Sequence, residues 1–304
     1  MQFNKILFSG VGSSWNEVYI KDGRRAQMHD FEDRSFRFHR EEYNLCLYGV
    51  FDGFHGSHVA DYITKRLPAE LVLGQIVPDI KDEQVKELVK QVFVSIDREY
   101  FGSIGEQLAA RMVMRSDIVC RQTQEQKSKL AEIEHFVSSG CSATIAVIVD
   151  KRIFVSNIGD CQAFLCYNNG NNEDGSDILV SSVSIDHNID NEDERLRLQH
   201  LGYQPQNNSN ETGLGNIEER YLIILKCVDS KDNVYLICQN IFLNVSVLGQ
   251  QNYTRCFGNY LVKGGYKECP QLSSCRDDPV VAEPEIQGPI PITDDLKMLV
   301  IATK

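Results

Sequence analysis

The sequence has no apolar run long enough to cross a membrane as a helix. Residues 221–247 are unusually apolar, but Gln239, Asn240 and Asn244 interrupt them, whereas a membrane-spanning helix needs about 20 predominantly apolar residues. The first residues contain one lysine and only a short apolar patch, which is not the pattern of a secretory signal. The sequence therefore predicts no membrane span and no secretory leader.

Cysteine is scarce, and its spacing excludes several kinds of site. There are 10 cysteines among 304 residues and no C-x-x-C pair, so neither a zinc ribbon nor a disulfide scaffold is indicated. No cysteine is followed six positions later by arginine, which excludes the loop of a cysteine-based phosphatase. Cys46, Cys141, Cys161 and Cys166 lie in or beside apolar runs, where we expect buried thiols. This use of cysteine favours a reducing intracellular compartment, and we expect a cytoplasmic protein.

Basic residues are outnumbered by acidic ones. Lys and Arg total 31 against 43 Asp and Glu, which gives a net charge of −12. Such a chain has no electrostatic footprint for nucleic acid, and anionic membrane surfaces would repel it. Hydrophobic residues make up 42% and charged residues 24%, which is enough apolar material for a sizeable core. The composition predicts a globular protein without a nucleic-acid partner.

The order of the hydrophobic patterns predicts an α+β fold. Grouped helices are followed by short antiparallel strands, rather than alternating with them one by one. The polar residues 106–136 are expected to form a solvated helix, with a mobile insertion as the alternative. The expected strands lie at residues 44–52, 143–149, 153–156, 163–167 and 178–185, and the expected helices at 57–76, 85–96 and 190–201.

Two segments do not fit the rest of the pattern. Residues 221–247 follow a polar loop rich in Gly and Asn, and we expect an insertion there, either an extra hairpin or a segment foreign to the fold, such as a retained intron. Residues 297–301 have the pattern of an apolar strand, and only three residues follow them. Because a domain rarely ends in the middle of an apolar strand, a domain truncated at its C-terminus is expected.

Three acidic signals stand out. Asp30 follows a basic segment, Asp52-Gly53 ends a predicted strand, and Gly159-Asp160 lies at a predicted turn. An aspartate at a strand end can present its carboxylate and a nearby backbone carbonyl to a hard cation. Two such ends side by side can hold two ions and lower the pKa of a bridging water. Taken singly, however, Asp-Gly is typical of an ordinary turn.

Taken in chain order, these signals resemble the motifs of the PPM-type metal-dependent Ser/Thr phosphatases, which have the protein phosphatase 2C fold. The motifs are R-x-x-M-x-D at residues 25–30, V-F-D-G-x-x-G at 50–56, G-D at 159–160, and a D-H pair with E-x-x-R formed by Asp186, His187, Glu194 and Arg197. The resemblance implies a sandwich of two antiparallel β-sheets flanked by helices, with metal ions at one end of the sandwich.

A second set of segments has its own pattern. It consists of residues 7–12, 47–53, 69–75, 191–194 and 254–288, with an Ala-Glu-Pro-Glu-Ile block at 282–286. These segments resemble the pseudophosphatase adaptors of TAK-type kinases, and the resemblance covers nearly the whole chain except residues 221–247. It implies a single phosphatase-like domain over residues 1–304, incomplete at its C-terminus, that joins a TAK-type kinase complex and other signalling proteins in stress and cytokine pathways. The kinase-binding helix of such adaptors lies C-terminal to the fold, outside this sequence.

The resemblance to active phosphatases also implies which residues would form the site. Arg25 stands where active members bind phosphate. The positions that hold metal in active members are occupied by Asp30, Asp52, Asp160 and the carbonyl of Gly53.

Three other positions depart from the active pattern. His29 replaces a glutamate that hydrogen-bonds metal-bound water, and Phe54 replaces the histidine proposed as general acid. Lys304 replaces a metal-binding aspartate of the active members, and its positive charge would repel a second divalent ion. His55, one position late, and His58, in the next predicted helix, are not obvious substitutes for the missing histidine.

These departures predict a vestigial site with no functional catalytic residue. The domain would require no cofactor and would hold at most one weak Mg²⁺ or Mn²⁺. Two alternatives remain open: an active Mg²⁺/Mn²⁺-dependent protein Ser/Thr phosphatase whose C-terminal metal ligands are missing, and a truncated fragment with no stable fold.

Overall fold

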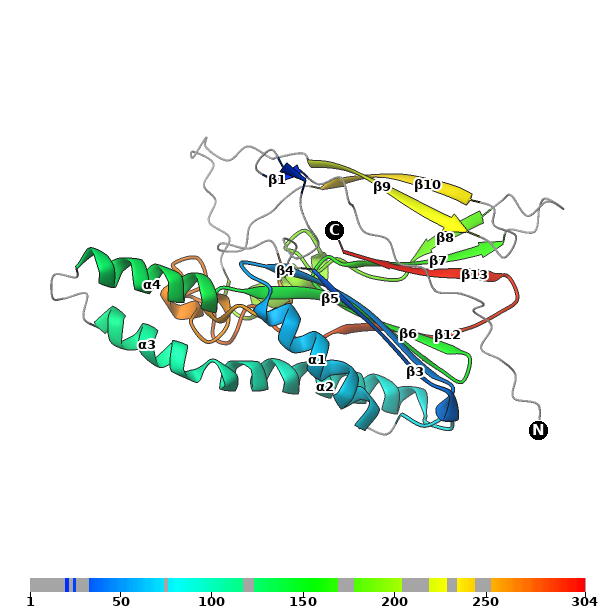
Figure 1. Cartoon of the computed structure of the whole chain (residues 1–304), viewed down its shortest axis with the longest axis horizontal. Helices are drawn as coiled ribbons and strands as arrows, with labels where there is room; N and C mark the ends of the chain where they lie inside the picture. The colour runs from blue at the N-terminus through cyan, green and yellow to red at the C-terminus, as the bar shows by residue number, and fades with distance from the viewer. Residues whose placement is uncertain are drawn as a thin grey trace.

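The structure is a computed structural model whose two main layers are antiparallel sheets (Figure 1). It describes residues 20–21, 24–25, 33–73, 76–116, 123–168, 178–203, 219–228, 234–243 and 253–303. The first of these pieces are the short strands β1 (Ile20–Lys21) and β2 (Arg24–Arg25), which pair with each other.

The larger sheet has six strands, five of them in the order β12-β6-β5-β4-β3, and β11 pairs with β5 beside this path. Its central strands β4 and β5 pair over ten residues each. A tight turn at Asp150-Lys151 joins β5 to β6, and both turn residues have positive φ. The bounds are β3 (Arg34–Arg40), β4 (Leu45–Phe54), β5 (Gly140–Val149), β6 (Arg152–Ile158), β11 (Phe257–Gly258) and β12 (Glu285–Pro291), with a 3-10 turn, η2 (Glu41–Tyr43), between β3 and β4.

The smaller sheet has the order β13-β7-β8. It consists of β7 (Gln162–Asn168), β8 (Ile178–Ser182) and β13 (Leu296–Ala302), so the predicted strand at residues 297–301 is confirmed. Apolar side chains from both sheets meet between them, including Ile148 and Val155 from the larger sheet and Leu165 from the smaller one. The predicted sandwich of two antiparallel sheets is confirmed.

Helices cover the face of the larger sheet that points away from the smaller one, and the last two of this group extend past the end of the sheet (Figure 1). The expected helices at residues 57–76 and 85–96 are confirmed as α1 (His58–Leu73) and the longer α2 (Asp82–Ser103). The prediction of a single helix within residues 106–136 is wrong, because this region contains two helices, α3 (Gly105–Ser116) and α4 (Gln124–Val137). A new helix can begin at α4 because Thr123 and Gln126 form a capping box there.

A fifth helix, α5 (Glu192–His200), follows the sandwich strands. Asn191 caps its first turn by accepting hydrogen bonds from the backbone N–H groups of Asp193 and Glu194. Gly202, at φ +93°, follows its end, as the sequence predicts. Two 3-10 turns, η4 (Tyr260–Val262) and η5 (Tyr266–Glu268), lie in the segment that returns to the larger sheet.

The apolar segment at residues 221–247 contains two paired strands. β9 (Glu219–Val228) and β10 (Val234–Leu243) form an antiparallel hairpin with ten paired residues. This is the extra hairpin that the sequence left open as one form of the insertion; that it is an insertion stays a prediction. Within the described part of the chain, no helix combines the length and the apolarity that crossing a membrane requires.

Candidate functional site

The inner face of the larger sheet changes from apolar to polar along its strands. Alternate residues of a strand point to the same face, so Cys46 and Asp52 share one face of β4, as do Ile153 and Asn157 of β6. The first member of each pair lies in the apolar core between the sheets, whereas the second lies toward the opposite end of the strand. The sandwich therefore has a polar end, the strand-end site, built mainly from Asp52, Ser142, Thr144, Asn157 and Asp160.

Two of the predicted metal-site residues meet at this end. Asp52 is paired directly with Ser142 in the β4–β5 ladder, and the Ser142 hydroxyl donates to Asp160 Oδ1 over 3.4 Å. Gly159 makes this approach feasible, because it has φ +82° and a Cβ there would come within 2.3 Å of Ser142 Cβ. The structure thus brings Asp52 and Asp160 to the same buried serine.

A buried amide fixes the turn that carries Asp160. Asn157 is almost fully buried, accepts a hydrogen bond from the Thr144 hydroxyl, and donates to the carbonyls of Ile185, at 2.8 Å, and Gly159, at 3.3 Å. The backbone N–H of His187 also donates to the Gly159 carbonyl, over 2.9 Å. Asp160 is therefore held in place by residues that bear no charge.

Two aromatic side chains border the carboxylates. The rings of Phe54 and Tyr253 lie 5.5 Å apart, and Phe54 also packs against a small apolar cluster that includes Leu198 and Cys256. Burial first, and then the negative charges of Asp160 and Asp52, raise the pKa of Tyr253. Burial and the same two carboxylates raise the pKa of Cys161 well above its ordinary value. The negative charges of the two carboxylates therefore act on both the phenol and the thiol.

Neither neighbouring histidine takes the place of Phe54. His55 has φ +57°, and its Nδ1 lies 3.1 Å from the Ser138 hydroxyl. His58 belongs to α1, stacks on Phe136 with ring centroids 4.2 Å apart, and places Nε2 3.3 Å from the Phe136 carbonyl oxygen. Both rings are therefore engaged with the end of α4 and the residue after it.

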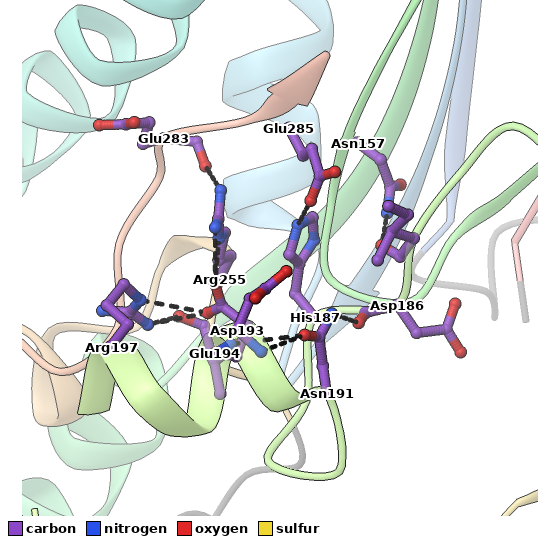
Figure 2. A network of polar contacts seen from close by, with 12 residues as sticks. Asn157, Asp186, His187, Asn191, Asp193, Glu194, Arg197, Arg255, Glu283 and Glu285 are labelled. Carbon is purple, nitrogen blue, oxygen red and sulfur yellow. Dashed lines mark hydrogen bonds and ion pairs between the residues drawn. The ribbon is translucent and has the colours of Figure 1, made fainter. Parts of the chain in front are cut away.

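The D-H and E-x-x-R motif forms a second polar cluster on α5, the α5 network (Figure 2). Glu194 is 1% exposed and accepts hydrogen bonds from Arg197, at 2.9 Å, and from Arg255, at 2.6 Å. Burial raises its pKa, but the hydrogen bonds and positive charges of the two arginines outweigh burial and lower the pKa to about 2. Arg197 also donates to the carbonyls of Thr254 and Pro279, and Arg255 to that of Glu283. Through these hydrogen bonds the motif holds α5 against the segment at Thr254–Arg255 and the segment at Pro279–Glu283.

His187 joins the α5 network to the strand-end site. Its side chain is fully buried, and its Nε2 lies 3.4 Å from the carboxylate of Glu285 on β12 (Figure 2). Its backbone N–H contacts Gly159 and its carbonyl accepts from the N–H of Thr254, at 3.0 Å. The side-chain contact with His187 is the largest cause that lowers the pKa of Glu285. The backbone N–H of His187 thus helps to position Gly159, the residue directly before Asp160.

The remaining predicted site residues are not brought into this geometry. Arg25 is described only as backbone, in β2, and Gly53 lies in β4 opposite Cys141. The predictions for His29, Asp30 and Lys304 lie outside the described residues. Among the described residues, no group of three or more His, Cys, Asp or Glu side chains could hold a metal ion. Two carboxylates are suitable donors for Mg²⁺ or Mn²⁺, but the aromatic rings beside them supply no further ligand, so these residues fit only part of a metal shell.

Four contributors to the site were not predicted from the sequence: Ser142, Thr144, Asn157 and Tyr253. The period-two pattern of β5 and β6 assigns Ser142 and Asn157 to the inner face, and their polarity within apolar strands is a usable signal. Tyr253 offers no such signal, because it reaches the site from a segment almost 100 residues after Asp160.

Comparisons with known proteins agree with this architecture. The family model for Protein phosphatase 2C matches residues 20–213. Protein phosphatase 2C 1 of Paramecium tetraurelia is 25% identical over 52% of this chain and 43% of its own length. Protein phosphatase 2C 37 of Arabidopsis thaliana is 30% identical over 59% of this chain and 41% of its own.

A third relative has a different kind of name. TGF-beta-activated kinase 1 and MAP3K7-binding protein 1 of Caenorhabditis elegans is 27% identical over 70% of this chain and 53% of its own length. The chain therefore spans about half the length of the curated relatives it matches.

The solved structure of a serine-threonine phosphatase 2C from Toxoplasma gondii shares the fold. The TM-score is 0.50 at 14% identity, over 89% of this chain and 72% of that one. The family model covers well over half of the sequence, and the sandwich, the Asp-Gly strand end and the α5 motif are all in place. The chain belongs to the protein phosphatase 2C family.

Proposed function

We propose that this chain is a catalytically degenerate phosphatase-like domain that serves as a cytoplasmic adaptor for a kinase of the TAK type. The observation that carries the proposal is Phe54. It occupies the place of the expected general acid, and it is packed against Tyr253 and the apolar cluster.

A phenyl ring at this position has a direct chemical consequence. Ester hydrolysis needs a proton for the departing oxygen, and general acid catalysis typically contributes about 10²–10⁴-fold in rate. Phe54 has no proton to give. His55 and His58 are held at Ser138 and Phe136, respectively.

The small number of carboxylate donors among the described residues supports the same proposal. When bound, Mg²⁺ or Mn²⁺ would supply an activated water and charge neutralisation at the phosphoryl group. Asp52 and Asp160 are the described side chains that would hold such an ion. Two carboxylates with water completing the shell fit at most one weakly held ion.

The adaptor role is supported by the Caenorhabditis elegans relative, whose name records binding to TGF-beta-activated kinase 1. It is tested by retention of this protein, expressed at full natural length with an affinity tag, on a purified TAK-type kinase. Stable retention is expected. Retention no better than that of an unrelated protein phosphatase 2C would contradict the adaptor role.

The loss of catalysis is tested with a phosphopeptide and with p-nitrophenyl phosphate in excess Mn²⁺. We expect turnover at the background level, indistinguishable from that of an Asp52→Ala control. The second candidate function is an active Mg²⁺/Mn²⁺-dependent protein Ser/Thr phosphatase, favoured by the retained Asp52 and Asp160 and by the phosphatase names of several relatives. A metal-dependent rate clearly above the Asp52→Ala control would establish that alternative.

A further inference from the structure

The Ala-Glu-Pro-Glu-Ile block at residues 282–286 contributes nothing to the strand-end site, but it borders a hollow in the surface of the protein. The hollow has a volume of about 680 Å³, which is within the range of clefts that bind ligands. Its walls are formed by one face of α2, by residues 283–286 of the block and by Asp193 of α5, and Arg255 also lines it. Three segments that are far apart in the sequence therefore meet around one open space.

The hollow has an excess of negative charge. Five acidic and three basic side chains line it, and two of the basic ones already have partners. Arg255 donates to Glu194 over 2.6 Å, and Lys90 forms an ion pair with Glu283 at 2.7 Å. Within the part of the chain that the structure describes, no ion pair neutralises the exposed acidic side chains that α2 and α5 contribute, which are Glu83, Glu87 and Asp193.

The fifth acidic residue, Glu285, lies between the hollow and a buried histidine. The ring of His187 is fully buried and points at the Glu285 carboxylate (Figure 2), yet neither of its nitrogens has a hydrogen-bond partner among the described residues. This contact, over 3.4 Å, and the charge of Arg255 outweigh burial and lower the pKa of Glu285, so its side chain is ionised at neutral pH. Gln287 donates the one hydrogen bond that the carboxylate accepts, at 3.2 Å, which leaves it free to accept from a donor outside the protein.

The occupant that fits these groups is a long basic side chain. Pro284 and Ile286 line the hollow with apolar surface, against which the methylene groups of lysine or arginine can pack while the charged head group reaches a carboxylate. A divalent metal ion fits less well, because Lys86 and Lys90 would repel it. In addition, no group of three or more His, Cys, Asp or Glu side chains that could hold a metal occurs among the described residues.

We propose that this hollow is a docking site for a lysine- or arginine-containing segment of a partner protein, with Glu285 and Asp193 as the carboxylates that receive its basic head groups. Glu283 is a third acceptor, because its ion pair with Lys90 joins side chains that are 48% and 43% exposed, and such exposed pairs are weak enough to be exchanged. Docking of this kind needs neither catalysis nor its loss at the strand-end site, so it goes beyond the proposed function.

The test is fluorescence anisotropy with the protein at its full natural length and a fluorescein-labelled hexapeptide in which arginine alternates with alanine. The wild type is expected to bind this peptide, but not the same peptide with glutamate in place of arginine. Glu285→Gln/Asp193→Asn should weaken binding about tenfold, because it removes two carboxylates that face the head groups. The control Glu125→Gln/Glu132→Gln makes the same change in net charge at exposed positions of α4. It should leave the affinity within about twofold of the wild type, because salt screens distant charges.

Glu83→Lys/Glu87→Lys provides a second variant if Glu285→Gln/Asp193→Asn does not fold, since both glutamates are exposed on α2. Reversing their charge should weaken binding more strongly than removing two charges does. A folded variant of either kind whose affinity stays within about twofold of the wild type would overturn the assignment of the hollow. An equally large loss in the α4 control, or equal binding of the arginine and glutamate peptides, would overturn it as well.

Discussion

Two neighbouring regions of this molecule contain buried carboxylates, and the side chains around these carboxylates differ between the two regions. In the α5 network, Glu194 faces Arg197 and Arg255 and makes a hydrogen bond with each. In the strand-end site, Asp52 and Asp160 lie around Ser142, next to the rings of Phe54 and Tyr253. Glu194 is thus paired with two cations, whereas the negative charges of Asp52 and Asp160 act together on their neighbours Tyr253 and Cys161.

The difference separates a charge that the fold itself neutralises from a pair of charges of the kind that binds a metal ion. An ionised group in the interior is costly unless opposite charges and hydrogen bonds compensate it. Glu194 receives that compensation from the protein itself, so its motif is needed by the fold whether or not the domain is catalytic. Two close carboxylates are the arrangement expected where a bound cation supplies the compensation. The two clusters should therefore respond differently to mutation.

The largest expected effect is on the α5 network. Glu194→Ala leaves two guanidinium groups that are only 26% and 16% exposed without their partner, and should lower the free energy of unfolding by about 3 to 5 kcal/mol. Urea unfolding measures this change. The control Glu192→Ala, on the same helix, removes an exposed ion pair with Arg195 at 3.6 Å and should cost less than about 1 kcal/mol. Equal losses in the two variants would contradict the structural role of Glu194.

A somewhat smaller change in the free energy of unfolding is expected when pH is lowered and Glu194 becomes protonated. The pKa of Glu194 is about 2 in the folded protein, against an ordinary value of 4.5. Because the folded pKa is the lower one, the stabilisation, about 3 kcal/mol, is fully present above pH 4.5 and is lost as pH falls toward 2. The difference in unfolding free energy between the wild type and Glu194→Gln should therefore shrink as pH is lowered through this range. A difference that stays constant would contradict the low pKa.

The smallest expected effect is at the strand-end site. Asp160→Asn keeps the shape of the side chain and removes its negative charge beside Asp52, so stability should stay the same or rise by up to about 1 kcal/mol. Asp79→Asn, at an exposed turn, is the control and should change stability by less than about 0.5 kcal/mol. A loss above about 1 kcal/mol for Asp160→Asn would show that its charge is compensated as that of Glu194 is, and the contrast between the two regions would disappear.

Much of the fold could be predicted because it follows local rules. The helical spacing in α1 and α2, the β-branched runs of β5 to β7 and the tight turn at Asp150-Lys151 are all set by residues close in sequence. The polar region 106–136 was harder, since its break into two helices depends on a cap at Thr123 that an overall polar composition conceals.

The sequence by itself determined which carboxylates this protein has, that Asp52 and Asp160 lie at strand ends, and that Phe54 occupies the position where a general acid was expected. Only the tertiary structure decided what surrounds them. Glu194 acquires Arg255 from 61 residues away, and the aspartates acquire Tyr253 from a segment that is placed by backbone hydrogen bonds to His187. These contacts arise from the packing of distant segments against the end of the sandwich. No local pattern encodes them, because side-chain periodicity specifies the face of a strand and not the segment that covers it.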